Sequence, residues 1–121
     1  MEDLMLSESE YRLMDVIWEH APIESGKLVK VCETELNWKK STTYTMLHKL
    51  IVKQMVANTD SLVTVLIPRD QVQMFESRRV VKRTFGGSLP SFVLSFLEDR
   101  SLSDSEADEL IRIIEEYKKG K

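Results

Sequence analysis

The spacing of apolar residues changes from a helical to a strand period near residue 56, and this change constrains the fold most. Three runs before that point have apolar residues at i, i+3 and i+4, which predicts three amphipathic helices. Their predicted ranges are 8–20, 25–36 and 41–55. Two short β-rich runs follow at 56–58 and 63–67, separated by Thr59-Asp60-Ser61. Three helices followed by a hairpin is the element order of a winged helix-turn-helix.

The predicted helix ends carry recognisable signals. Ser7 and Glu10 form the S-x-x-E pattern of a capping box, and Pro22 stops the first helix. We expect Ser25 to cap the second helix. Cys32 lies on the apolar side of that helix, so we interpret it as a small buried hydrophobe and not as a reactive thiol.

The C-terminal half predicts further helices over 70–84, 89–97 and 104–117, with a glycine-containing break at 85–88. Ser103 and Glu106 predict a cap for the last one. We therefore predict a mostly α chain with a small β-hairpin, divided into a winged helix-turn-helix domain (1–69) and helical dimerisation domain (70–121).

The last two helices are short and strongly amphipathic, so their apolar faces need a partner. A second copy of the chain is the simplest partner, and folding back onto the first domain is the alternative. The residues predicted to form the dimer interface are Leu89, Phe92, Val93, Phe96, Leu97, Leu110, Ile111 and Ile114.

The chain has a formal net charge of −3, which argues against a generic nucleic-acid binder. The distribution of charge is more informative than the sum. Residues 25–55 hold six lysines against two glutamates, and a second basic cluster lies at 78–83. Acidic residues gather at the N-terminus and in 98–116, away from both basic segments.

The start of the third predicted helix combines lysines with hydroxyl side chains. A helix N-terminus has free backbone N–H groups and the positive end of the helix dipole, which suit phosphate contact. The alternative is an ordinary solvated face. We predict that Lys39, Lys40 and Ser41 contact phosphates. Thr42, Thr45, His48 and Lys49 are candidates for the DNA groove, although Lys49 could equally reach the backbone. Tyr44 either joins this face or packs beneath the helix.

No catalytic, cofactor or metal-ligand motif accompanies these features. We therefore expect neither an enzyme nor a metal site, and we expect no cofactor. The acidic start lacks the basic segment of a signal peptide, no apolar run approaches membrane-spanning length, and the single cysteine excludes an internal disulfide. These observations predict a cytoplasmic protein without membrane insertion.

Nearly the whole chain resembles the penicillinase-repressor family, the winged-helix repressors of β-lactamase and methicillin-resistance genes, which also includes copper-transport operon repressors. Three segments carry the resemblance. Residues 6–23 are similar to the family's opening, including Trp18 and Pro22. Phe85-Gly86-Gly87-Ser88-Leu89 resembles the start of its dimerisation region. The residues that fit its W-x-x-x-T-x-x-T-x-L-x-[RK]-L pattern are Trp38, Thr42, Thr45, Leu47, Lys49 and Leu50.

The resemblance implies a homodimeric repressor that binds a palindromic, inverted-repeat operator in double-stranded DNA. It also implies a membrane-bound sensor protease system whose signal leads to cleavage within the dimerisation helix. Ser95-Phe96 aligns best with the family's cleavage pair, with serine where the antibiotic-resistance repressors have asparagine.

The sequence departs from the family pattern in two places. Residues 58–62, between the predicted strands, contain no Lys or Arg, and the C-terminus lacks the cysteine cluster of copper-responsive members. The predicted hairpin is the wing of the fold, and its lack of Lys and Arg, together with the acidic net charge, favours an alternative function. This alternative is a winged-helix protein-interaction module with weak or no DNA binding. The lysines of 25–55 oppose that alternative.

Overall fold

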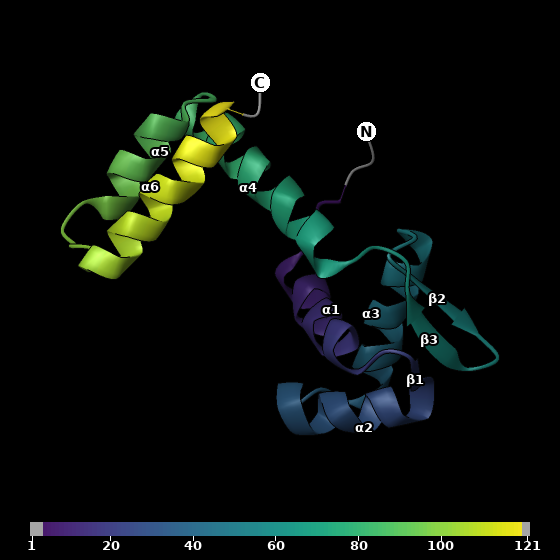
Figure 1. The fold of residues 1–121 in the computed structure, drawn as a ribbon. Helices are drawn as coiled ribbons and strands as arrows, with labels where there is room; N and C mark the ends of the chain where they lie inside the picture. The colour runs from purple at the N-terminus through teal and green to yellow at the C-terminus, as the bar shows by residue number, and fades with distance from the viewer. Residues whose placement is uncertain (1–3, 120–121) are drawn as a thin grey trace. The chain divides into compact units, whose positions relative to one another are not determined.

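A computed structural model describes residues 4–119 of the chain. Within this range the backbone forms six helices and a three-stranded antiparallel sheet (Figure 1). The elements are α1 (Glu8–His20), β1 (Ile23–Glu24), α2 (Ser25–Leu36), α3 (Lys40–Val52), β2 (Val56–Thr59), β3 (Leu62–Val65), α4 (Arg69–Phe85), α5 (Leu89–Leu97) and α6 (Asp104–Lys119). The predicted fold class, a mostly helical chain with a winged helix-turn-helix, is confirmed.

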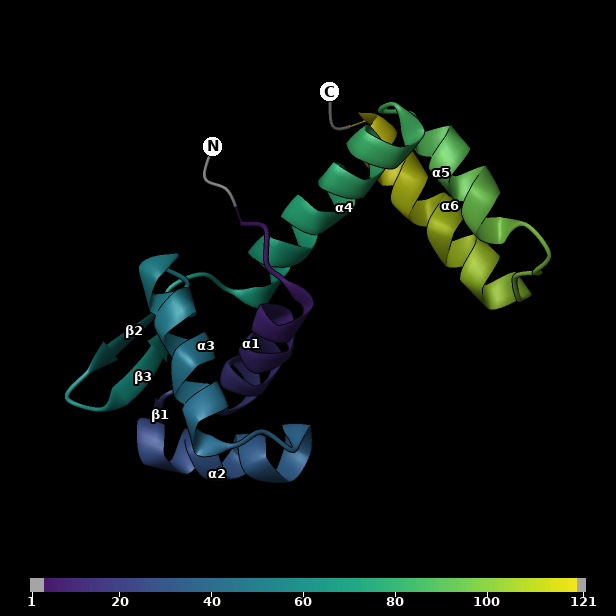
Figure 2. The ribbon, with the colours of Figure 1, turned by 180° about the vertical axis from the view of Figure 1, so that it is seen from behind.

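The chain divides into two compact units, which meet after Val80 inside α4. The first unit holds α1, α2, α3, the sheet and the part of α4 up to Val80. Figures 1 and 2 both show α2 running across one end of α1 and α3. The side chains that fill the middle of this unit are apolar and almost inaccessible. The fully buried ones include Leu13, Met14 and Ile17 of α1, Leu28 and Cys32 of α2, Leu50 of α3, and Met55, Val56, Val63 and Val72.

The sheet has the strand order β1-β3-β2, with Ile23 opposite Val63 and Thr59 opposite Leu62. Asp60 and Ser61 alone connect β2 to β3, and both have positive φ values of 52° and 66°. Two positive values in a two-residue loop define the turn that matches the twist of a hairpin. Strand β1 was not predicted, because two residues are too few to show an alternating pattern.

Two predicted helix ends are wrong. Ser25 does not cap α2: it is the first helical residue, it is buried, and Glu24 occupies the cap position without a side-chain hydrogen bond. The Ser25 backbone N–H instead donates to Ser61 O at 2.8 Å, which extends the strand pairing into the helix start. Helix α3 ends at Val52 and not at residue 55, because Gln54 takes a left-handed conformation (φ 62°).

The predicted capping box of α1 is confirmed. Ser7 Oγ accepts a hydrogen bond from the Glu10 N–H at 3.2 Å, and Glu10 Oε1 accepts one from the Ser7 N–H at 2.8 Å. Ser103 likewise caps α6 by accepting from the Glu106 N–H at 3.1 Å. These polar patterns are local in sequence, which is why the sequence alone could identify them.

Among the residues of the second unit whose burial is described, 81–118, none is buried within a single chain. Helices α5 and α6 lie side by side in both views, and no residue of α5 is buried (Figures 1 and 2). Phe85, Phe92 and Phe96 form a row of aromatic contacts, with ring centroids 5.4 and 6.0 Å apart. The large apolar side chains exposed on α5 and α6 are Leu89, Val93, Leu94, Phe96, Leu110, Ile111, Ile113, Ile114 and Tyr117. Because α4 continues across the division after Val80, a functional domain boundary at 69/70 stays a prediction.

Candidate nucleic-acid interface

Helix α3 has one buried and one exposed face. Thr43, Leu47 and Leu50 are buried in the core, and Met46 and Ile51 pack against it. Every residue that the sequence predicted to contact DNA is exposed: Lys39, Lys40, Ser41, Thr42, Tyr44, Thr45, His48 and Lys49. Tyr44, whose place was open, is 37% exposed and therefore belongs with the exposed side. The helix thus presents these side chains together along its outer face.

The N-terminus of α3 has an electrostatic arrangement that is unfavourable for the helix alone. Lys39 occupies the cap position without a side-chain hydrogen bond, and the first turn contains no acidic residue. The free N–H groups and the positive dipole end therefore meet two lysines, Lys39 and Lys40, instead of a carboxylate or hydroxyl cap. An external anion would satisfy both the N–H groups and the lysines.

Val52 is a member of the exposed face of α3 that sequence reasoning missed. Its side chain is 67% exposed, and it follows Ser41, Thr45 and His48 at successive spacings of four, three and four residues. This spacing was readable in the sequence, but an apolar residue type gives no signal for DNA contact. An exposed branched side chain beside polar ones can contact the methyl group of thymine in the major groove.

The hairpin beside α3 lacks positive charge. Its turn exposes Asp60, and Leu62 at the start of β3 is 41% exposed. The exposed cations nearest to the hairpin in sequence are Lys53, just before β2, and Arg69, at the start of α4. Lys27 and Lys30 of α2, the helix that precedes α3, are also exposed. Electrostatic attraction to a polyanion in this unit therefore comes from exposed lysines and arginines outside the hairpin, which is the wing of the fold.

The junction between α2 and α3 contains the chain's only thiol. Burial raises the pKa of Cys32 above its ordinary value, the neighbouring Thr43 side chain lowers it, and the Glu35 carboxylate raises it. Thr43 Oγ1 is itself buried without a hydrogen bond of standard geometry. A buried thiol with a raised pKa is a poor nucleophile. Cys32 is therefore buried as predicted and serves packing between the two helices.

Among the described residues, one group combines side chains that can ligate a metal: Glu19, His20 and Glu35, with ligand atoms within 4.8 Å of one another. All three side chains are exposed, and they lie at the ends of α1 and α2. The contact within the group is between His20 Nε2 and Glu35 Oε2 at 3.8 Å, an ion pair when the imidazole is protonated. The sequence analysis did not identify this group. In the part of the chain that the structure describes, no helix is both long and apolar enough to span a bilayer.

Comparison with known proteins places this arrangement in a family. The family model described as penicillinase repressor matches residues 6–116. The chain belongs to this family. It is 35% identical to the penicillinase repressor of Bacillus licheniformis, over 96% of this chain and 94% of that protein. It is 22% identical to the methicillin resistance regulatory protein MecI of Mammaliicoccus sciuri, over 90% and 92% of the two chains.

The penicillinase repressor of Staphylococcus aureus is also 22% identical, over 94% of each chain. The resemblance drawn from three sequence segments is therefore confirmed, and it extends along nearly the whole chain. These relatives carry the names of repressors and of a resistance regulator. Membership of a transcriptional repressor family indicates a regulatory role.

Proposed function

We propose that the protein is a homodimeric transcriptional repressor that binds an inverted-repeat operator in double-stranded DNA in the cytoplasm. The exposed face of α3 carries this proposal: it combines an uncapped, lysine-flanked N-terminus with hydroxyl and imidazole side chains along one side. Lysines at the positive end of a helix dipole are costly without an anion, and the DNA backbone supplies one.

The side chains of α3 divide by the group they would contact. Lys39, Lys40 and Ser41, at the N-terminus, would contact phosphates and set the register on the duplex. Thr42, Thr45, His48 and Lys49 would face the base edges, although Lys49 is long enough to reach a phosphate instead. Val52 would add an apolar contact at the far end of the helix.

The exposed apolar faces of α5 and α6 support dimerisation. Leu94, Ile114 and Tyr117 are 75%, 62% and 75% exposed in the single chain. Side chains of this size are rarely gathered on the free surface of a monomer. A second copy would cover both faces and would place two α3 helices on paired half-sites.

Release from DNA would follow cleavage in α5. Ser95 and Phe96 are exposed in the single chain, on a helix of 9 residues. Cutting such a helix leaves pieces too short to be helical alone, so the dimer contacts and the avidity for paired half-sites would be lost together. A membrane sensor protease system is the partner that this release would need, and a role in antibiotic resistance would follow.

The test is binding of the intact dimer to a pool of random duplexes, followed by measurement on the selected sequence by fluorescence anisotropy. The expected selection is an inverted repeat. Lys40→Ala should weaken all duplexes similarly and reduce the salt slope by about one unit, because a phosphate contact is lost. Thr45→Ala, one turn further along the same face, should instead change the preferred sequence with little effect on the salt slope. No binding to any duplex at low salt would contradict the proposal.

A second candidate function is a protein-interaction module. The wing without Lys or Arg and the net charge of −3 favour it, since both weaken attraction to a polyanion. The salt dependence separates the two functions, because a module without DNA contacts shows no counterion release.

A further inference from the structure

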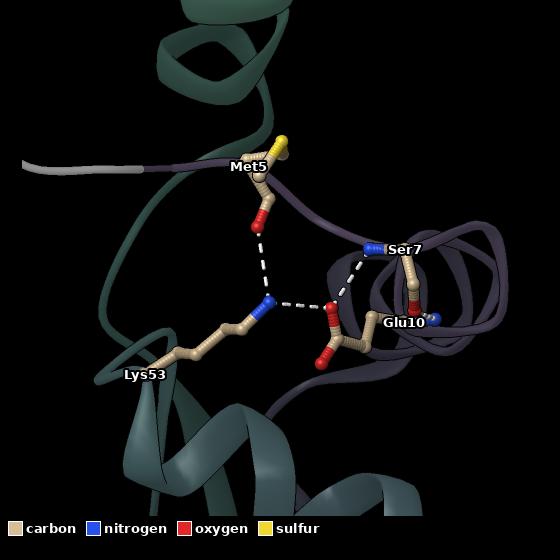
Figure 3. Close-up of polar contacts among 4 residues, drawn as sticks. All are labelled: Met5, Ser7, Glu10 and Lys53. Atoms are coloured by element: carbon tan, nitrogen blue, oxygen red, sulfur yellow. Dashed lines mark hydrogen bonds and ion pairs between the residues drawn. The ribbon is translucent and has the colours of Figure 1, made fainter.

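A charged contact joins the end of α3 to the start of α1. Glu10 of α1 is only 4% exposed, and its Oε1 accepts a hydrogen bond from Lys53 Nζ at 2.6 Å (Figure 3). Lys53 directly follows α3 as its C-cap residue. The same ammonium group donates to the backbone oxygen of Met5 at 3.0 Å. One side chain thus connects the end of α3 to both the first turn of α1 and the segment before it.

The carboxylate end of this contact is held by its own helix. Glu10 Oε1 also accepts from the Ser7 N–H at 2.8 Å, within the capping box. Preceding the box, Leu4 is buried in the core at 7% exposure. The acceptor atom therefore has a fixed position before Lys53 reaches it, so the constraint acts mainly on α3.

The backbone changes direction directly after α3, at the position of Lys53. Gln54 is left-handed, the Met55 N–H returns to Leu50 O at 2.9 Å, and the chain then enters β2 at Val56. Lys53 therefore stands at the junction where the direction of α3 and the start of the hairpin are both set. Lys49 and Val52, members of the exposed face, lie within one turn of it.

We propose that Lys53 is a positioning residue that fixes the axis of α3 for DNA recognition without contacting DNA itself. This inference rests on the proposed function. A helix of 13 residues is about 20 Å long, so a tilt of roughly five degrees at one end displaces the other by about 2 Å. Hydrogen bonds to base edges do not survive a displacement of that size.

The experiment compares Lys53→Met with Arg69→Met in the intact chain. Arg69 is a matched control, because it is a half-exposed cation of the same unit whose ion pair with Asp15 at 3.4 Å and contact with the Trp18 ring are both made to α1. Two properties are measured: amide hydrogen exchange along the chain, and affinity for the selected operator and for random duplex, under conditions in which all variants are folded.

In Lys53→Met, exchange of the amides at the end of α3 should become about tenfold faster, with a smaller change in the middle of α1. Operator affinity should fall about tenfold or more, while random-duplex affinity and the salt slope stay unchanged. Arg69→Met should change neither the exchange at the end of α3 nor the ratio of operator to random-duplex affinity. Lys53→Arg, which retains the charge, should recover part of that ratio.

Three outcomes would overturn the inference. Unchanged exchange at the end of α3 would show that Lys53 does not hold the helix, whatever the DNA result. An equal loss for operator and random duplex with a lower salt slope would make Lys53 a phosphate contact. Faster exchange with unchanged operator affinity would show that the Glu10–Lys53 ion pair has a purely structural role. If the unmodified chain binds no duplex at all, the proposed function itself fails, and that failure is visible before any variant is compared.

Discussion

The two units of this chain treat their apolar side chains in opposite ways. In the first unit, Leu13, Ile17 and Leu28 are completely inaccessible, and three helices and a sheet enclose them. In the second unit, Phe96 and Ile114 are 58% and 62% exposed, and α5 buries no residue. The first unit therefore encloses a core with its own contacts, whereas the second presents an apolar surface that a second copy would cover in the proposed dimer.

The largest effect is expected in the second unit, at the interface of the proposed dimer. Phe96→Ala removes an exposed ring that the proposed dimer would bury, and truncating a buried phenylalanine typically costs about 3–5 kcal/mol. The variant should be monomeric at micromolar concentration and should bind a paired half-site much more weakly. Sedimentation equilibrium measures this directly. If the unmodified chain is itself a stable monomer, the proposal that a second copy covers the apolar surface of the second unit is wrong.

Leu13→Ala tests the other side of the comparison. Leu13 is fully buried in the first unit, so its truncation should lower the free energy of unfolding of that unit by about 2–5 kcal/mol. Because the lost contacts lie within one chain, this loss should not depend on protein concentration. Thermal unfolding of the variant at several concentrations checks the point. A loss that disappears at high concentration would mean that the first unit also relies on a partner.

The sequence predicted the fold well where its signals were local. Capping residues such as Ser7 and Ser103, and the helical spacing of apolar residues, are carried by neighbours in the chain. Features that depend on distant pairing were not predictable. Ser25 is the first helical residue and not the cap, and its N–H donates to Ser61, far along the chain. Strand β1 exists only because β3 lies beside it.

The candidate interface shows the same limit. Its lysines and hydroxyls were identifiable, because these residue types at a helix N-terminus have a direct meaning for phosphate contact. Val52 was missed, since an apolar residue carries no such signal until its exposure is known. The Glu10–Lys53 contact was also invisible, because nothing local relates two residues 43 positions apart.

The pH dependence of the free energy of unfolding tests how much the Glu10 carboxylate stabilises the first unit. Burial raises the pKa of Glu10, but the contacts with Lys53 and Ser7 lower it more, so it lies below the ordinary value of 4.5. A carboxyl with a lowered pKa in the folded state stabilises the fold above the unfolded pKa and loses this contribution as pH falls through the folded pKa.

Glu10→Gln should therefore destabilise the first unit at pH 7 by about 1–3 kcal/mol, the usual range for a hydrogen bond to a charged group. The difference from the unmodified chain should shrink once pH falls below about 4.5. Urea unfolding between pH 7 and pH 3 measures the free energy of unfolding of the variant and of the unmodified chain. The matched control is Glu8→Gln, which changes an exposed carboxyl on the same helix. A stability difference between the two chains that stays constant with pH would show that the charge of Glu10 does not stabilise the folded state.

The smallest effect concerns a polar group that the first unit buries at a cost. Thr43 Oγ1 is inaccessible and lacks a hydrogen bond of standard geometry, although the side chain lies at the packed junction of α2 and α3. Valine has nearly the same shape without the hydroxyl. Thr43→Val should therefore stabilise the first unit by about 1 kcal/mol, because an unsatisfied buried hydroxyl costs roughly that much or more. Thr42→Val, on the exposed face of the same helix, should leave stability nearly unchanged. Thermal unfolding compares the two. A loss of stability in Thr43→Val would mean that the hydroxyl makes a contact with the Cys32 thiol that the helix junction needs.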